Sequence, residues 1–191
     1  LREQQFNAAK MIPNSGIVCT EELSNGTTVR YAQLFKCEQV LRSDCNRGVS
    51  GIEGSTSTAA GAACVGEEMT VLITGDMSFS YDVNGLSSTY LSPRFKIIVM
   101  CNGGGGIFRF IKPTSDLPEL ETCFEIHRDI SVEKYADLFG LRYFELNDEK
   151  SAAEVLSLFF AEKDRPAILA VHTPNVYNAE VLRGYFRRSR Q

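Results

Sequence analysis

The chain has 191 residues, of which 43% are hydrophobic and 23% charged, and its formal net charge is −4. This composition is typical of one compact domain over residues 1–191 and is too apolar for a disordered chain. The negative charge argues against a nucleic-acid partner or an anionic membrane surface. No apolar segment approaches the roughly 18 residues needed to cross a bilayer, and the start lacks the apolar core of a signal peptide, so we expect a cytoplasmic protein.

Residues 1–15 are expected to form an N-terminal helix or junction. The chain begins without Met and partway into a helical pattern, which indicates a piece of a longer protein.

The cysteines never occur as CxxC, and most stand among apolar or small residues. Buried free thiols are therefore expected in place of a zinc site or disulfides. The six cysteines are Cys19, Cys37, Cys45, Cys64, Cys101 and Cys123.

Short apolar runs between turn residues predict the β-strands. The runs are continuous and do not alternate with polar residues, as expected of parallel strands covered on both faces. The predicted strands span residues 16–20, 39–42, 70–74, 96–101, 142–146 and 166–173.

Two helices are predicted with particular clarity between these strands. Apolar residues within 132–139 recur with the period of an α-helix, and Gly140 follows as a natural end. The same spacing recurs within 152–160, behind an N-cap expected at Asn147 or Asp148. Strands that alternate with helices predict an α/β fold with a doubly wound, mostly parallel sheet of about six strands and helices on both faces.

Three other segments complete the pattern. Residues 51–64 are rich in Gly, Ala, Ser and Thr, and should form a helix that packs very close to a neighbour or a ligand. Residues 111–127 contain two prolines and no clear period, so a loop or lid is expected there. A last helix is predicted from about Asn178.

Polar residues follow two strands that come one after the other in the sequence. Gly75 and Asp76 end one apolar run, and Asn102 follows the next, 26 residues after Asp76. Ligands of parallel sheets bind at the carboxyl ends of strands. If a helix starts at Asp76, the free N–H groups around Met77 and Ser78 favour a phosphate there, with a cation between phosphate and carboxylate.

Four glycines follow Asn102 without interruption, at residues 103–106. Mg²⁺ prefers oxygen ligands, and it could take the Asp76 carboxylate, the Asn102 amide oxygen and the Gly104 carbonyl together with phosphate oxygens. We interpret the run as bare so that the backbone can close around a metal diphosphate. The plainer alternative is a flexible loop with Asp76 as an N-cap.

This pattern resembles the diphosphate-binding domain of the thiamin-diphosphate-dependent enzymes. Neither GxxxxGK[ST] nor a GxGxxG after the first strand is present, which disfavours the P-loop and Rossmann alternatives. Three segments narrow the resemblance to the SEPHCHC synthase family of menaquinone biosynthesis, over about residues 16–191. They are "CNRGVSGIEGSTSTAAGAA", "GDMSFSYDVNGL" and "CNGGGGIFRF", and "SNGTTVRYAQLF" resembles the family's Asn-Ser-x-x-x-Arg block.

The resemblance implies an enzyme that decarboxylates 2-oxoglutarate and adds the succinyl unit to isochorismate, with thiamin diphosphate and Mg²⁺ or Mn²⁺ as cofactors. The residues it implies for cofactor binding are Gly51, Ile52, Gly75, Asp76, Met77, Ser78, Asn102 and Gly104, with Asp76, Asn102 and Gly104 as metal ligands. Those it implies for substrate binding are Asn25, Arg30, Arg47, Ile107 and Phe108. Arginine suits both polyanionic substrates because its guanidinium group binds a carboxylate through two hydrogen bonds.

The chain departs from the family pattern in three places. Gly26 stands where the family has Ser, Cys101 where it has Asn, and Glu53 where Asp is common. In addition, the activating glutamate of this superfamily comes from a pyrimidine-binding domain of a partner subunit, and that domain and the central domain are missing. The resemblance therefore implies no catalytic residue in this chain, no activity of the chain alone, and a homo-oligomer (dimer or tetramer).

Two alternatives remain open. The chain could belong to another thiamin-diphosphate-dependent decarboxylase or synthase that acts on 2-oxoacids, such as an acetohydroxyacid-synthase-like enzyme, or it could be a non-catalytic assembly subunit.

Overall fold

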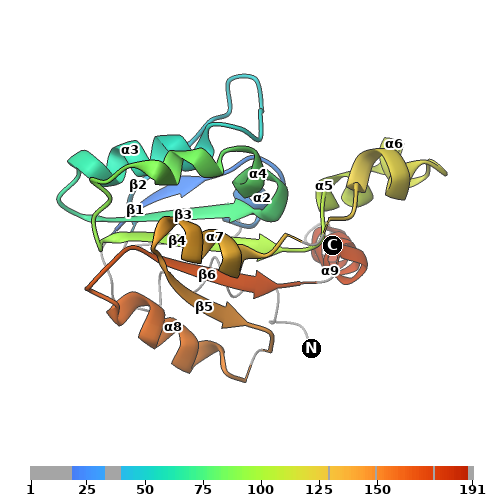
Figure 1. Ribbon diagram of the computed structural model, residues 1–191. Coiled ribbons are helices and arrows are strands. Elements are labelled where there is room, and N and C mark those ends of the chain that lie inside the picture. The colour runs from blue at the N-terminus through green and yellow to red at the C-terminus, as the bar shows by residue number, and fades with distance from the viewer. Residues whose placement is uncertain (1–18, 33–39, 129, 149, 174, 189–191) are drawn as a thin grey trace.

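The computed structural model describes residues 19–32, 40–128, 130–148, 150–173 and 175–188. Within these ranges the chain forms one six-stranded sheet with the strand order β2-β1-β3-β4-β6-β5 (Figure 1). Every pairing in it is parallel, which confirms the predicted α/β class. The strands are β1 Cys19–Leu23, β2 Val40–Cys45, β3 Met69–Gly75, β4 Phe95–Cys101, β5 Arg142–Leu146 and β6 Ala167–His172.

The first strand differs most from its prediction. The apolar run at 16–20 predicts a strand, but β1 continues through Glu21 and Glu22, which are 3% and 7% exposed. Residues 16–18 lie outside the described ranges, and so do residues 1–15, where a helix or junction is expected. The Ser43 hydroxyl on β2 donates a hydrogen bond of 2.7 Å to the Glu21 carboxylate. Burial raises the pKa of both glutamates. Hydrophobic patterning ends the strand too early because it treats acidic residues as exposed.

Helices and helical turns fill the connections between the strands. The predicted helix over 132–139 is confirmed as α7, and Gly140 ends it with φ 70° and an N–H bonded to the carbonyl of Ala136. The helices are α2 Thr27–Ala32, α3 Ser55–Val65, α4 Asp76–Tyr81, α5 Gly106–Phe110, α6 Lys112–Ser115, α7 Val132–Phe139, α8 Ala152–Ala161 and α9 Asn175–Arg188, with a 3₁₀ turn η1 Val83–Ser87 and a π-helical turn η2 Leu120–Glu125.

Three sequence expectations about helices need correction. The N-cap of α8 is Ser151, whereas the Asp148 carboxylate accepts N–H groups of Lys150 and Ser151 in the preceding turn, at 2.9 and 3.2 Å. Helix α9 begins at Asn175, ahead of the position expected from its apolar face. The expected loop over 111–127 contains α6 and η2. Helix α8 thus starts later than predicted, whereas helical structure at α9 and within 111–127 extends beyond the apolar pattern.

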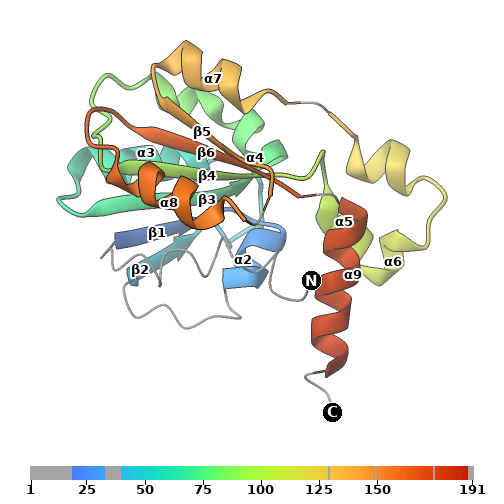
Figure 2. The same ribbon diagram turned by 90° about the horizontal axis from the view of Figure 1, so that it is seen from below.

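Apolar side chains form a core on each face of the sheet. One core joins the sheet to α2 and α8, with Phe159 and Ile98 fully buried in it. The other joins it to α3, η1 and α7, with Phe79 and Ile97 fully buried. Figures 1 and 2 show α3 and α7 over one face and α8 over the other. No helix in the described ranges is long and apolar enough to cross a membrane.

The small residues of α3 allow the close packing that the sequence predicts. Ala59 is fully buried, and a Cβ added to Gly85 of η1 would lie 2.8 Å from the Cα of Ser57. Asp82 accepts hydrogen bonds from the backbone N–H and the hydroxyl of Ser57, at 2.7 and 2.6 Å. The neighbour that approaches α3 closely is therefore the turn after α4.

The described cysteines form no disulfide bonds, as predicted, but they are not all buried. Cys64 on α3 and Cys123 on η2 are exposed, because both helices are covered on one side only. Cys37 lies outside the described residues. The five described cysteines are Cys19, Cys45, Cys64, Cys101 and Cys123.

Candidate functional site

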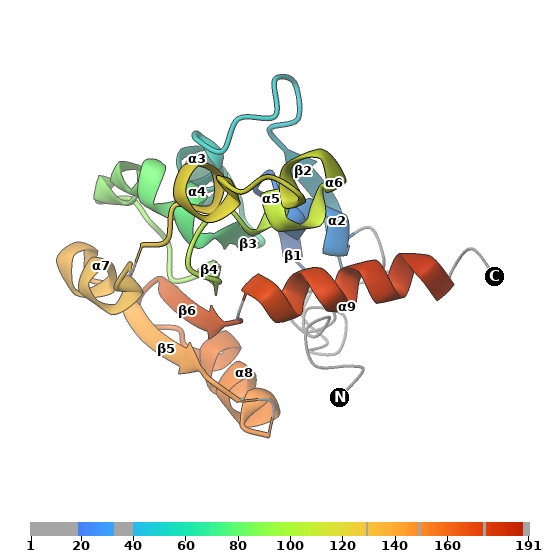
Figure 3. The ribbon, with the colours of Figure 1, turned by 90° about the vertical axis from the view of Figure 1, so that its right-hand side faces the viewer.

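The carboxyl ends of β3 and β4 lie side by side, and they bring Asp76 and Asn102 together. The two strands pair up to Gly75 and Met100. The Oδ2 atom of Asp76, the first residue of α4, accepts the N–H groups of Asn102 and Gly103 at 3.0 and 2.7 Å. Figure 3 looks onto this edge of the sheet, where α4, α5 and α9 gather.

The Asp76 carboxylate is buried, with 3% of the residue exposed. Burial raises its pKa, and the N–H groups of Gly103, Met77 and Asn102 act in the opposite direction. None of the ion pairs in the described part of the chain includes Asp76. A buried carboxylate held by neutral N–H groups is an environment that a cation would stabilise.

Asn102 and Gly104 carry two further oxygen atoms in the loop whose N–H groups bind this carboxylate. The Oδ1 atom of Asn102 accepts the N–H of Gly104 at 3.2 Å, and the Gly104 carbonyl accepts the N–H of Gly106 at 2.8 Å. A carboxylate, an amide oxygen and a carbonyl suit Mg²⁺, which needs further oxygens to reach six ligands. The described residues contain no group of three or more His, Cys, Asp or Glu that could hold a metal, so the remaining ligands would be water or phosphate oxygens.

Two glycines of the run, Gly104 and Gly105, are required by the packing of the protein itself. A Cβ on Gly104, whose φ is 139°, would lie 2.1 Å from the carbonyl oxygen of Glu125. One on Gly105 would lie 2.6 Å from that of Phe124. Packing therefore supplies one reason why these two positions lack side chains, and closure of the backbone around a metal diphosphate stays a prediction.

Residues 120–127, here called the covering segment, are held over the glycine loop by a buried ion pair. Glu125 is fully buried and accepts bonds from Nε and Nη2 of Arg109 at 2.7 and 2.6 Å. Its backbone carbonyl accepts the N–H of Gly105 at 2.8 Å. His127 Nδ1 lies 3.1 Å from the carbonyl oxygen of Gly103. Hydrogen bonds to Glu125 raise the pKa of Arg109 further above its usual range.

The start of α4 differs from the expected phosphate cradle. The N–H of Met77 donates to Asp76 Oδ1 at 2.7 Å, so the carboxylate folds back onto a group that the sequence suggests is free. The Ser78 hydroxyl donates to the carbonyl of Ile52. A Cβ added to Gly75 would meet no described atom within 4 Å, which leaves open space at the strand end.

A second polar group lies at the ends of β1 and β2, around Asn25. This residue is 6% exposed, and its Nδ2 donates to the carbonyls of Asn46 and Gly51 at 2.6 and 2.5 Å. Its Oδ1 accepts Nη1 of Arg47 at 2.7 Å. Asn25 therefore fixes both the loop after β2 and one guanidinium group of the predicted substrate site.

The two predicted substrate arginines lie near each other. Arg30 donates to the carbonyl of Gly26, and burial together with the charge of Arg47 lowers its pKa. Gly26 has a φ of 114°, a conformation that a residue with a side chain rarely adopts. The departure from Ser at this position therefore suits the local backbone.

Ile107 and Phe108 lie on α5, directly after the glycine run, and both are half-buried. The ring of Phe108 packs against Phe124 of the covering segment, with centroids 5.4 Å apart. These residues thus border the glycine loop on the side of the covering segment.

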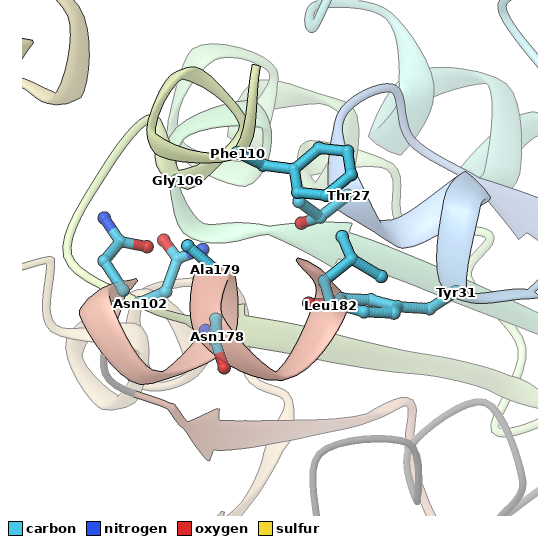
Figure 4. Close-up of a pocket in the computed structure, with 9 residues that line it drawn as sticks. Thr27, Tyr31, Asn102, Gly106, Phe110, Asn178, Ala179 and Leu182 are labelled. Carbon is cyan, nitrogen blue, oxygen red and sulfur yellow. The ribbon is translucent and has the colours of Figure 1, made fainter. Parts of the chain in front are cut away.

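Asn175, the first residue of α9, is a further polar residue at this edge of the sheet that the sequence patterns do not single out. It is 5% exposed, and neither its Nδ2 nor its Oδ1 has a hydrogen-bond partner. It lines a small pocket together with Asn102 and Gly106 (Figure 4). Its position in the sequence could have indicated a role at this edge, because Asn175 follows the end of β6 as Asp76 and Asn102 follow β3 and β4.

Comparison with known proteins agrees with this geometry. Residues 25–171 match the family described as "Thiamine pyrophosphate enzyme, C-terminal TPP binding domain". Among curated proteins the chain is similar to 2-succinyl-5-enolpyruvyl-6-hydroxy-3-cyclohexene-1-carboxylate synthases, 48% identical in Porphyromonas gingivalis over 85% of the chain and 28% of that protein. The match in Flavobacterium johnsoniae is 42% identical over 87% of the chain and 30% of that protein.

The chain spans less than a third of the length of these relatives. The family match covers the strand ends that carry Asp76 and Asn102 as well as the loops around Asn25 and Arg47. The chain belongs to the thiamine pyrophosphate enzymes, in the family of their C-terminal TPP-binding domains.

Proposed function

We propose that this chain is the cofactor-binding domain of a SEPHCHC synthase, a transferase of menaquinone biosynthesis that decarboxylates 2-oxoglutarate and adds the succinyl unit to isochorismate. The observation that carries the proposal is the contact between Asp76 and the backbone of Asn102 at neighbouring strand ends. The names of the similar proteins support the choice of reaction within the superfamily.

The donor atoms fit a Mg²⁺ or Mn²⁺ ion that binds a diphosphate. Asp76 would supply a carboxylate oxygen, Asn102 its amide oxygen and Gly104 its carbonyl, and the diphosphate would complete the set. Thiamin diphosphate, when bound, supplies a carbon that can accept the electrons released by loss of CO₂. Gly75, Gly51 and Ile52 would border the cofactor, and the carbonyl of Ile52 accepts the hydroxyl of Ser78 on α4. Met77 and Ser78 complete the proposed cofactor set at the start of α4.

The remaining proposed site residues would bind and orient the substrates. Arg30 and Arg47 form a pair of nearby cations suited to dicarboxylates, since guanidinium groups bind carboxylates with two hydrogen bonds. Asn25 holds Arg47 in place at 2.7 Å. Ile107 and Phe108 would supply an apolar surface, and low polarity favours loss of CO₂ from a charged species.

The proposal assigns proton transfer at the cofactor to a part of the enzyme outside this chain. An activating glutamate would come from the pyrimidine-binding domain of a partner subunit, in a homo-oligomer (dimer or tetramer). The chain alone would then bind without turnover. The test must therefore use the protein that carries this chain together with its complementary domains.

Calorimetric titration with thiamin diphosphate, with and without Mg²⁺, tests the proposal. Wild type should bind the cofactor in a Mg²⁺-dependent way, and Asp76→Ala should lose this binding. Asp137→Ala, which removes an exposed carboxylate on α7, should behave as wild type. Unchanged binding in Asp76→Ala would reject the metal assignment.

An activity assay separates the proposed reaction from its alternatives. The proposal predicts consumption of isochorismate that depends on 2-oxoglutarate. Turnover of pyruvate in its place would indicate another 2-oxoacid decarboxylase or synthase of this superfamily. The absence of Mg²⁺-dependent cofactor binding, even with the complementary domains supplied, would favour an assembly subunit.

A further inference from the structure

The start of α9 lies directly beside the Asn102 loop. Strands β4 and β6 pair up to Cys101 and His172, and the N–H of Thr173 donates to the carbonyl of Cys101 at 2.9 Å. The Nδ2 atom of Asn178 then donates to the carbonyl and the hydroxyl of Thr173 at 3.2 and 3.1 Å. These bonds fix where the chain enters α9, and they place Asn175 next to the proposed metal site.

The side chain of Asn175 is buried but has no partner. With 5% of the residue exposed, its donor and its acceptor both lack hydrogen bonds. Buried polar groups in proteins are nearly always paired, and an exception calls for an explanation such as a missing ligand or a functional role. The residue also lies beyond residue 171, where the family match ends.

Asn175 and Asn102 meet at Gly106. A Cβ built on Gly106 would lie 2.2 Å from Oδ1 of Asn175 and 2.9 Å from Nδ2 of Asn102. An acceptor of one amide and a donor of the other thus border the same point. The opposite end of the Asn102 amide, its Oδ1, accepts the N–H of Gly104.

The pocket at this point is too small and too neutral for a separate ligand. It has room for about one water molecule, and the residues that line it carry no formal charge. Figure 4 shows Asn102 beside the start of α9, with Phe110, Leu182 and Tyr31 at the far end of the pocket. A neighbouring side chain that is reached through one water is therefore the candidate partner of Asn175.

We propose that Asn175 is a positioning residue for Asn102. Its Oδ1 accepts a hydrogen bond from Asn102 Nδ2 through one water in the pocket that both residues line, and thereby keeps the Asn102 amide oxygen directed toward the proposed metal site. Outer partners of this kind fix which atom of a ligand faces the metal. The inference rests on the proposed function, because it requires Asn102 to be a metal ligand.

Two substitutions at this position separate its chemistry from its shape. Asn175→Leu keeps the approximate volume and removes the acceptor, and it should weaken Mg²⁺ binding at saturating thiamin diphosphate by roughly 10- to 100-fold. Asn175→Asp keeps an acceptor and should bind Mg²⁺ at least as tightly as wild type. Calorimetry on the protein that carries this chain, with its complementary domains, gives both affinities.

The melting temperature of the metal-free protein supplies a second readout. Replacing an unpaired buried amide by an apolar group of similar shape should leave that temperature unchanged or raise it. A merely structural role would instead lower stability and Mg²⁺ affinity together. Leu182→Ala is the matched control, because it removes a buried apolar side chain farther along α9 and should lower stability without a comparable loss of Mg²⁺ affinity.

The outcomes distinguish this inference from the proposed function. If wild type binds Mg²⁺ and thiamin diphosphate, Asp76→Ala does not, and Asn175→Leu binds as wild type, then the role of Asn175 is rejected while the proposed function stands. Loss of affinity in Asn175→Asp as large as in Asn175→Leu would also reject it. If wild type shows no Mg²⁺-dependent binding, both proposals fail.

Discussion

Lys96 on β4 should make the stability of this domain depend on alkaline pH. The residue is fully buried, its Nζ donates to the carbonyl of Glu162 at 2.7 Å, and it lies 5.9 Å from the ring centroid of Phe159. Burial lowers its pKa from 10.5 to about 8. The charged amine is therefore less favourable in the folded state than in the unfolded chain.

The sign and the size follow from this pKa difference. Between pH 8 and 10.5 the unfolded chain binds more protons at Lys96, so the free energy of unfolding rises with pH across that window. Below pH 8 both states are charged and the folded state carries the full penalty. One pKa unit corresponds to about 1.4 kcal/mol, so the whole difference amounts to about 3 kcal/mol.

Lys96→Met removes this contribution, and the test compares wild type with the variant. Urea denaturation is carried out at pH values from 7 to 10.5 and is monitored by hydrogen exchange in peptides from β4 and β6. The exchange reports the free energy of unfolding for this part of the sheet. The advantage of the variant over wild type should shrink by about 3 kcal/mol as pH rises, and other titrating groups cancel in the comparison. Lys112→Met, which removes an exposed lysine, should show no such trend. A difference between wild type and Lys96→Met that stays constant over this range would refute the reasoning.

Two further substitutions test the packing of the glycine loop. Gly104→Ala places a Cβ 2.1 Å from a backbone oxygen at a φ of 139°, so this substitution should destabilise the loop by about 2 kcal/mol or more and release bound cofactor. The control is Gly61→Ala on α3, where the new Cβ meets no described atom within 4 Å. This control should stabilise the protein by about 0.5–1 kcal/mol. Thermal denaturation and cofactor retention check this pair, and equal effects would contradict it. Arg109→Ala leaves the Glu125 carboxylate buried without its cation, so the substitution should lower the local free energy of unfolding by about 3 kcal/mol and speed hydrogen exchange in the covering segment. Exchange at the wild-type rate would show that the ion pair does not hold the covering segment in place.

Most of the fold was predictable because the central strands are covered on both faces. A parallel strand that is buried on both faces is mostly apolar, and β3, β4 and β6 are so over most of their length, although β4 also buries Lys96. The edge of the sheet was less predictable, because Glu21 is buried against Ser43 of a neighbouring strand. That contact depends on strand pairing, which hydrophobic patterning does not encode.

The candidate site also has a part that the sequence predicts and a part that it does not. Asp76 and Asn102 were predictable as neighbours because both follow strands that the fold places side by side. The packing that excludes side chains at Gly104 and Gly105 was not predictable. The atoms that exclude them belong to Phe124 and Glu125, in a segment without a clear sequence period. Asn175 was missed because its polar character matters only once β6 pairs with β4.

The glycine loop links the stability of the covering segment to the proposed metal site. Asp76 is held by N–H groups of Asn102 and Gly103, and the same loop is held from the other side by the carbonyl of Glu125. Because Arg109 fixes Glu125, its loss should disturb the carboxylate through the backbone, although Arg109 donates no hydrogen bond to Asp76 among those the structure describes. Cofactor retention in Arg109→Ala should therefore fall together with protection of the covering segment. Exposure of the segment with full cofactor retention would show that Asp76 is oriented by α4 alone.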